Sequence, residues 1–267
     1  MNRVTSKDGT SIAYDRTGSG PAVILVGGGL DDGSENAPLA PELAEHFTVV
    51  NYARRGRGES VDTVPYAIER EIEDIDALIA EAGGSAHLYG VSSGGALALE
   101  AAAAGHSGID KLAVYEVPYS MADDWPQRWR EYVEQLGPVL AEGRRGDALE
   151  LFMRLTGSSD EDIAQGRSSP FWAASEALEH TLPYDAACLG DGRPPTARLA
   201  KIAQPTLVAT GVGARQPGAA SWVLALDQAA DAIAASIPHA ERQTIEGQIH
   251  VADPKAVAPV LERFFRG

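Results

Sequence analysis

The sequence predicts an α/β fold, in which helices cover both faces of a mostly parallel sheet. Over residues 1–117 of the 267-residue chain, short apolar runs alternate with segments of helical periodicity, and the alternation resumes after residue 200. Residues 118–200 contain helical patterns without a strand pattern. We therefore expect a core formed by residues 1–117 and 201–267, with residues 118–200 inserted as a helical cap.

The expected strands are short runs rich in β-branched and other apolar residues, bounded by glycine, proline or polar residues. The run Ala22–Val26 is apolar throughout, which is typical of a strand covered on both faces. The expected strands are Ser11–Arg16, Ala22–Val26, Phe47–Tyr52, Ala86–Val91, Lys111–Val117, Pro205–Thr210 and Glu241–Glu246.

The expected helices are identified by apolar residues that recur at helical spacing. In residues 65–82, four isoleucines recur at spacings of 4, 3 and 4 and form one apolar stripe: Ile68, Ile72, Ile75 and Ile79. Further helices are expected at Ala37–His46, Ser93–Ala104, Trp125–Ala141, Gly146–Thr156, Ser159–Gln165, Phe171–Leu182, Ala219–Ala235 and Pro254–Phe265.

The composition restricts the partners of the chain. With 22 Lys+Arg against 38 Asp+Glu, the net charge is −16, which argues against nucleic acid or an anionic membrane. We expect a small-molecule substrate, and the sequence does not decide whether the chain forms a homodimer. The N-terminus lacks an apolar signal segment, no stretch is apolar enough for a membrane span, and Cys188 is the only cysteine; a cytoplasmic protein without an internal disulfide is therefore expected.

The strongest chemical signal is the motif G-x-S-x-G at Gly90–Gly94, between an expected strand and an expected helix. A nucleophilic serine at such a sharp turn needs small neighbours two residues before and after it. The first N–H groups of the following helix point at the anion that forms on attack. Ser92 is thus the candidate nucleophile, and the adjacent Ser93 is expected to lend its backbone N–H to an oxyanion hole.

In these features the chain resembles the α/β-hydrolase superfamily, most closely its lidded esterase and lactonase branch. The likeness covers nearly the whole chain and also includes Gly27–Gly29, Arg55–Ser60 and Gly247–His250. It implies a cap after the sixth strand, counted as in that family. It also implies a second oxyanion N–H at Gly29, with Gly28 as the alternative. The family usually has His-Gly where this chain has Gly27-Gly28.

His250 is the expected general base, because it follows the last expected strand, as the order Ser…acid…His requires. The other five histidines are interpreted as structural or exposed. The usual position of the acid, the loop Gly211–Gly218, has no carboxylate. Some relatives instead carry the acid at the end of the strand before the cap, which is Glu116 here. A Ser–His dyad helped by water and a helix carboxylate such as Asp227 are the alternatives.

These residues predict a serine hydrolase that cleaves a small, largely apolar carboxylic ester or lactone through an acyl-enzyme. Its rivals are a C–C bond hydrolase or cofactor-free perhydrolase on the same triad, a non-catalytic ligand-binding relative, and a lyase or transferase of the same fold. Arg54, Arg55 and Arg57 could bind an anionic substrate, but a structural role is favoured. No metal-ligand spacing or dinucleotide fingerprint is present, so no cofactor is expected.

Overall fold

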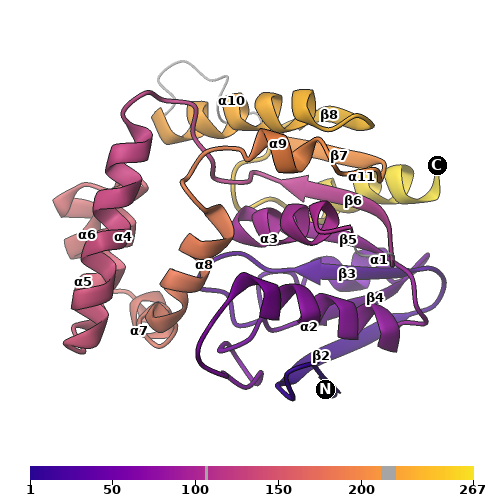
Figure 1. Ribbon diagram of the computed structural model, residues 1–267, viewed down its shortest axis with the longest axis horizontal. Helices are drawn as coiled ribbons and strands as arrows, with labels where there is room; N and C mark the ends of the chain where they lie inside the picture. The colour runs from indigo at the N-terminus through magenta and orange to yellow at the C-terminus, as the bar shows by residue number, and fades with distance from the viewer. Residues whose placement is uncertain (106–107, 212–220) are drawn as a thin grey trace.

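The computed structural model describes residues 1–105, 108–211 and 221–267 and is shown in Figure 1. Its strands form a single sheet in the order β1-β2-β4-β3-β5-β6-β7-β8. The strands are β1 (Asn2–Thr5), β2 (Ser11–Gly18), β3 (Ala22–Val26), β4 (Thr48–Tyr52), β5 (Ala86–Val91), β6 (Ile109–Tyr115), β7 (Thr206–Gly211) and β8 (Ala240–Ile245).

The six neighbouring strands β4, β3, β5, β6, β7 and β8 run parallel to one another. Strand β2 is antiparallel to both of its neighbours, which are β1 and β4. The predicted fold class, a mostly parallel sheet flanked by helices, is therefore confirmed. The strand β1 was not predicted, because this four-residue edge strand is mostly exposed and has no apolar run. Because β3 to β8 are parallel, the loops that follow them meet at one edge of the sheet.

The helices of the core lie on both faces of the sheet (Figure 1). The apolar residues of α1 and α11 pack in one layer against the sheet, and those of α2, α3 and α10 pack in the layer on the opposite face. The isoleucine stripe of α2 is buried in the second layer from Ile72 to Ile79. These helices are α1 (Leu39–Leu43), α2 (Ile68–Glu81), α3 (Ser92–Ala103), α10 (Ser221–Ser236) and α11 (Pro254–Arg266).

The remaining helices lie between β6 and β7 in the sequence, where the cap is expected. They are α4 (Trp125–Ala141), α5 (Arg145–Leu155), α6 (Asp160–Gly166), α7 (Pro170–Glu176), η1 (Glu179–Thr181), α8 (Leu182–Leu189) and α9 (Thr196–Leu199). Figure 1 shows α4 to α7 at one side of the molecule, with α8 between them and the sheet. The boundary at residues 118–200 stays a prediction, and "cap" below means these residues. No helix in the described ranges has the length and apolarity that crossing a bilayer requires.

The prediction of a single helix at Phe171–Leu182 is wrong, because the structure divides this region into α7, η1 and α8. Pro183 lies in the first turn of α8. A proline has no backbone N–H and its ring clashes with the carbonyl four residues earlier, so it favours the start of a helix over its interior. The consequence is a separate helix α8 that turns back toward the core, and this helix carries a residue of the site described next.

Candidate active site

The candidate nucleophile lies at a sharp turn between β5 and α3. Ser92 is the first residue of α3 and has φ of +55°, in the left-handed region that L-residues other than glycine rarely adopt. A non-glycine residue there costs about 1–3 kcal/mol, and such conformations cluster at functional sites because the surrounding structure must enforce them. The half-buried Ser92 therefore has the strained backbone expected of a nucleophile at a strand-to-helix turn.

Close packing explains the two glycines that flank the serine. A Cβ on Gly90 would lie 2.5 Å from the carbonyl oxygen of Gly94, and a Cβ on Gly94 would overlap the carbonyl oxygens of Gly27 and Val26. The turn at Ser92 thus leaves no room for a side chain on either glycine. The end of β3 is in direct contact with the start of α3, which brings the Gly27–Gly29 turn next to the serine.

The structure brings His250 and Glu116 together, although 134 residues separate them in the sequence. The Nδ1 atom of His250 lies 2.8 Å from Oε2 of Glu116, and Oε1 of Glu116 accepts the backbone N–H of Gly211 at 2.9 Å. The carboxylate is buried, and a buried carboxylate needs such partners. With the His250 proton on Nδ1, this bond orients the ring and leaves Nε2 to accept a proton.

The backbone around this pair is also fixed. Glu116 has φ of +48°, so β6 ends at Tyr115 rather than at Val117 as the sequence analysis expected. The Glu116 N–H still donates to the Ala209 carbonyl of β7, and the Tyr115 hydroxyl donates to the carbonyl of Ile249 at 2.7 Å. Tyr115, at the end of β6, therefore holds the loop that carries His250. The next residue, Glu116, contacts the His250 ring itself.

The alternative acid, Asp227, lies in α10 and forms an ion pair with Arg242. Its carboxylate also accepts a hydrogen bond from the hydroxyl of Thr210 at 3.2 Å. Since Glu116 occupies the Nδ1 side of His250, the geometry favours Glu116 over Asp227 as the orienting acid. Of the loop Gly211–Gly218, only Gly211 belongs to the described residues.

The two candidate oxyanion glycines have different surroundings. The Gly28 N–H donates to Oε2 of Glu35 at 2.7 Å, and the Gly28 carbonyl accepts Nη1 of Arg57 at 2.6 Å. Among the described residues, no protein acceptor receives the Gly29 N–H. Ser93, the other candidate donor, is at the start of α3, where backbone N–H groups have no partner within the helix. The geometry thus favours Gly29 over Gly28.

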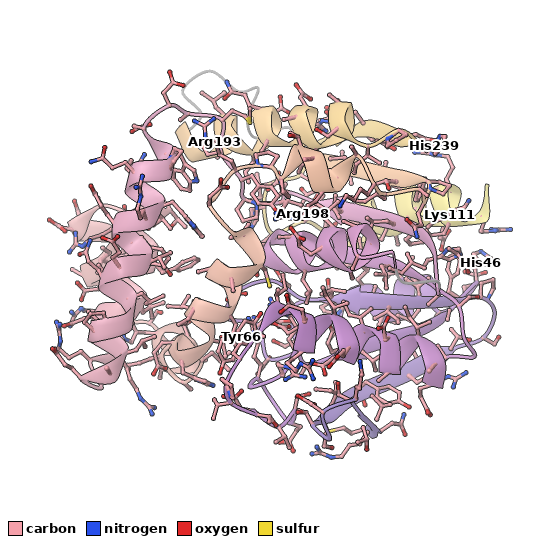
Figure 2. All side chains as sticks on the ribbon, viewed as in Figure 1. His46, Tyr66, Lys111, Arg193, Arg198 and His239 are labelled. Atoms are coloured by element: carbon pink, nitrogen blue, oxygen red, sulfur yellow. The ribbon has the colours of Figure 1, made fainter. Side chains whose placement is uncertain are left out.

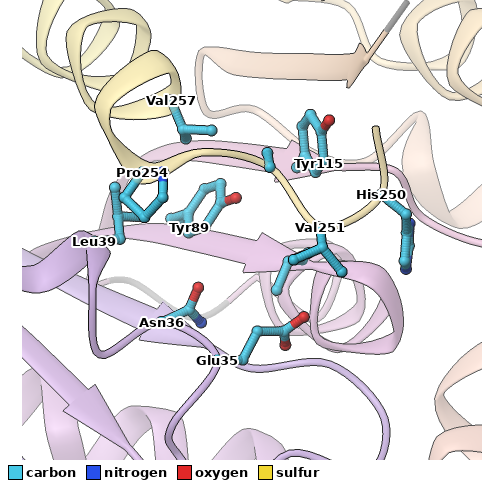
Figure 3. A pocket seen from close by; sticks show the side chains of 11 residues that line it. Glu35, Asn36, Leu39, Tyr89, Tyr115, His250, Val251, Pro254 and Val257 are labelled. Carbon is cyan, nitrogen blue, oxygen red and sulfur yellow. The ribbon is translucent and has the colours of Figure 1, made fainter. Parts of the chain in front are cut away.

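Glu35 is a residue that the sequence analysis missed. Together with Val91 and His250 it lines a cavity of about 50 Å³ beside the candidate site (Figure 3). Burial raises the pKa of the Glu35 carboxyl above its ordinary value, although its bond to Gly28 acts in the opposite direction. Glu35 belongs to no motif, and its carboxylate reaches the Gly28 N–H only in the folded chain.

The arginines after β4 are buried and paired, which confirms the structural interpretation for them. Arg54 makes two bonds of 2.7 Å to Glu71. Arg55 makes bonds of 2.8 and 2.7 Å to Asp74. Such bidentate pairs are the strong form of the arginine–carboxylate interaction. Both carboxylates come from the first half of α2, so the turn after β4 is fixed to this helix.

A second missed residue, Asp185 of α8, completes the arginine cluster. Its Oδ1 atom accepts Nη1 of Arg54 at 2.8 Å, Nη2 of Arg57 at 2.7 Å and the hydroxyl of Ser93 at 2.7 Å. Burial raises the pKa of Asp185, but Arg57 and Arg54 outweigh burial, so the pKa lies below its ordinary value. Cys188, one turn later in α8, is buried, and burial raises the pKa of its thiol to about 12, as befits a packing residue.

Of the predicted site residues, the structure joins His250 to Glu116 and places Ser92 against the Gly27–Gly29 turn. A Cβ placed on Gly28 would lie 3.0 Å from the Cβ atom of Ser92 and 3.1 Å from Oε2 of Glu35. Ser92 and Glu35 therefore both lie against Gly28. Because Glu35 also borders the cavity lined by His250, the serine and the imidazole approach the same region. The hydrogen bond between Ser92 and His250 stays a prediction. In the described ranges, His, Cys, Asp and Glu side chains form no cluster suited to a metal ion.

Comparisons with known proteins identify the family of the chain. The model of the alpha/beta hydrolase family matches residues 22–260. The chain is 32% identical over 262 residues to the pimeloyl-[acyl-carrier protein] methyl ester esterase of Xanthomonas campestris pv. campestris, covering 94% of this chain and 97% of the relative.

Among solved structures, an alpha/beta hydrolase from Sphaerobacter thermophilus is 49% identical, with a TM-score of 0.89 and coverage of 99% of this chain and 100% of that one. A thermophilic esterase from Thermogutta terrifontis, at 23% identity, shares the fold with a TM-score of 0.71 over 99% of this chain and 97% of its own. The chain therefore belongs to the alpha/beta hydrolase family and is a hydrolase.

Proposed function

We propose that this hydrolase cleaves a small carboxylic ester or lactone, using Ser92 as nucleophile, His250 as general base and Glu116 as the orienting acid. The observation that carries the proposal is the 2.8 Å contact between His250 Nδ1 and Glu116. This carboxylate was expected only because the usual acid position holds none. The strained backbone of Ser92 is the second support.

In the first half of the proposed reaction, Ser92 Oγ attacks the ester carbonyl carbon while Nε2 of His250 takes its proton. The negative charge that develops on the carbonyl oxygen is stabilised by the N–H groups of Gly29 and Ser93. The intermediate collapses when its C–O bond to the leaving group breaks, and His250 returns the proton to the departing alkoxide. An acyl-enzyme on Ser92 remains.

In the second half, a water molecule attacks the acyl carbon and His250 removes its proton. The bond between the acyl carbon and Ser92 Oγ then breaks, the serine regains a proton from His250, and the carboxylic acid leaves. Glu116 stays ionised throughout and stabilises the positive imidazolium at each step. The residues of this chain thus supply every proton transfer that the hydrolysis needs.

The esterase of Xanthomonas campestris, whose name gives a methyl ester as its substrate, supports an ester over the other substrate classes. The rival interpretation as a non-catalytic ligand-binding protein depended on the missing aspartate. The position of Glu116 beside His250 removes that support. The predicted apolar character of the substrate stays a prediction.

Steady-state kinetics with three substrates test the proposal. We expect p-nitrophenyl acetate or butyrate to be hydrolysed with a kcat/KM about 100-fold or more above that for a vinylogous diketone, since a pocket matched to one reacting group rejects another by this order. Peracid formation from acetate and hydrogen peroxide should be slower than ester hydrolysis. Preferential cleavage of the diketone, or no turnover of any of the three, would contradict the proposal.

A further inference from the structure

A single carboxylate oxygen of the cap is bonded to Ser93, one residue of the proposed oxyanion hole, and to Arg57, which holds the turn that carries the other. As described above, Oδ1 of Asp185 accepts hydrogen bonds from Ser93, Arg54 and Arg57. Asp185 comes from α8, which packs directly on α3, the helix that begins at Ser92. The bond to Ser93 fixes the first turn of α3 from the cap side, where the Ser93 N–H must point at the substrate.

The path from Asp185 to Gly29 runs through Arg57. While Nη2 of Arg57 donates to Asp185, Nη1 of the same guanidinium donates to the carbonyl of Gly28. A trans peptide is planar, so the carbonyl of Gly28 and the N–H of Gly29 point in opposite directions. Holding the Gly28 carbonyl therefore sets the direction of the Gly29 N–H. The second oxygen, Oδ2 of Asp185, lies 3.2 Å from the position that a Cβ on Gly29 would take.

We propose that Asp185 is a positioning residue through which docking of α8 aligns both oxyanion donors, Ser93 directly and Gly29 through Arg57. This inference rests on the proposed function, because it assigns the task of Asp185 within that reaction. The oxyanion hole is then assembled by the cap as well as by the two core turns.

The charges of the cluster agree with this role. Two buried arginines face two buried carboxylates, Glu71 and Asp185, and Glu71 already binds Arg54 with both of its oxygens. Asp185 is therefore the carboxylate that holds Arg57. An asparagine at 185 would keep a hydrogen-bond acceptor but lose the negative charge. Arg57 would then lose the ion pair that holds its guanidinium beside the Gly28 carbonyl.

The contact between Asp185 and Arg57 is distinct from other contacts between cap and core. Arg198 of α9, labelled in Figure 2, forms an ion pair of 2.7 Å with Glu100 of α3. This pair also ties the cap residues to α3, but Glu100 is in the third turn of the helix, away from Ser93. Glu100→Gln is therefore a matched control that weakens docking without touching the oxyanion donors.

The test compares Asp185→Asn with Glu100→Gln in the full chain, using a p-nitrophenyl ester and a trifluoromethyl ketone that forms an oxyanion on Ser92. Losing an oxyanion donor costs about 10²- to 10³-fold in kcat, so misaligning the donors in Asp185→Asn should cost about 10- to 100-fold. Binding of the ketone should weaken by a similar factor, while KM stays within about threefold of wild type. Glu100→Gln should leave kcat and ketone binding unchanged.

An Asp185→Asn protein that is less heat-stable but keeps wild-type kcat and ketone affinity would overturn the inference and leave only a structural role. If Asp185→Asn does not fold, Ser93→Ala removes the hydroxyl bond to Asp185 and keeps the backbone N–H. It should then lower kcat and ketone affinity together, and unchanged values would again overturn the inference. Failure of the wild-type protein to hydrolyse the ester would instead contradict the proposed function, and the inference would fall with it.

Discussion

Replacing Ser92 with alanine is expected to lower kcat for ester hydrolysis by about 10⁴- to 10⁶-fold, the range found when a serine hydrolase loses its nucleophile. Alanine keeps the Cβ but lacks the hydroxyl oxygen that attacks the carbonyl in the proposed reaction. The fold should survive, since alanine and serine both carry a Cβ and meet the same steric cost at the φ of +55°. The measurement is kcat under saturating p-nitrophenyl ester, with unfolding followed by circular dichroism.

The matched control for this variant is Ser19→Ala, which changes an exposed serine in the turn before β3. This turn is at the opposite end of β3 from Gly27, so the control should have wild-type kcat. A folded Ser92→Ala protein that retained more than about a tenth of the wild-type kcat would rule out Ser92 as the nucleophile, given the size of the effect expected.

Replacing Glu116 with glutamine is expected to lower kcat by about 10²- to 10⁴-fold, the upper value being that for an aspartate-to-asparagine change in a related triad. The two oxygens of Glu116 accept bonds from two donors, His250 and the Gly211 N–H. Glutamine has one oxygen and one NH₂ group, so one of the two donors must face another donor. If the NH₂ group faces His250, it favours the tautomer whose Nε2 carries the proton and cannot accept one from Ser92.

Two variants calibrate this result. Glu241→Gln, on the exposed surface of β8, makes the same chemical change away from the site and should leave kcat unchanged. His250→Ala removes the base outright and should lower kcat at least as much as Glu116→Gln. Near-normal turnover by a folded Glu116→Gln protein would favour a Ser–His dyad over the triad.

The sequence predicted most of the fold because the signals there are local. The isoleucine stripe of α2 and the continuous apolar run of β3 each determine their element from neighbouring residues. Where the outcome depends on other parts of the chain, the prediction was wrong or incomplete. The short edge strand β1 is defined only by its pairing with β2, and the position of α8 follows from its packing on α3. The start of α8 follows instead from a local signal, Pro183, which the single helix predicted at Phe171–Leu182 did not take into account.

The same distinction applies to the site. Ser92 is indicated as the candidate nucleophile by a motif whose glycines have a steric reason, and Glu116 as the candidate acid by the absence of a carboxylate where one is usual. Asp185 and Glu35 were not predictable, because neither belongs to a motif and each reaches its partner only in the folded chain. The buried arginines gave a partial signal: each needs a carboxylate, but the sequence does not say that one of them comes from the cap.

The central claim is that His250 activates Ser92, and covalent labelling tests it most directly. Wild-type protein treated with a fluorophosphonate should gain one phosphonyl group, and mass spectrometry of its peptides should locate the group on Ser92. Labelling should be slower by orders of magnitude in His250→Ala. Absence of labelling in the folded wild-type protein, labelling at another residue, or equal labelling rates in the two proteins would contradict the account.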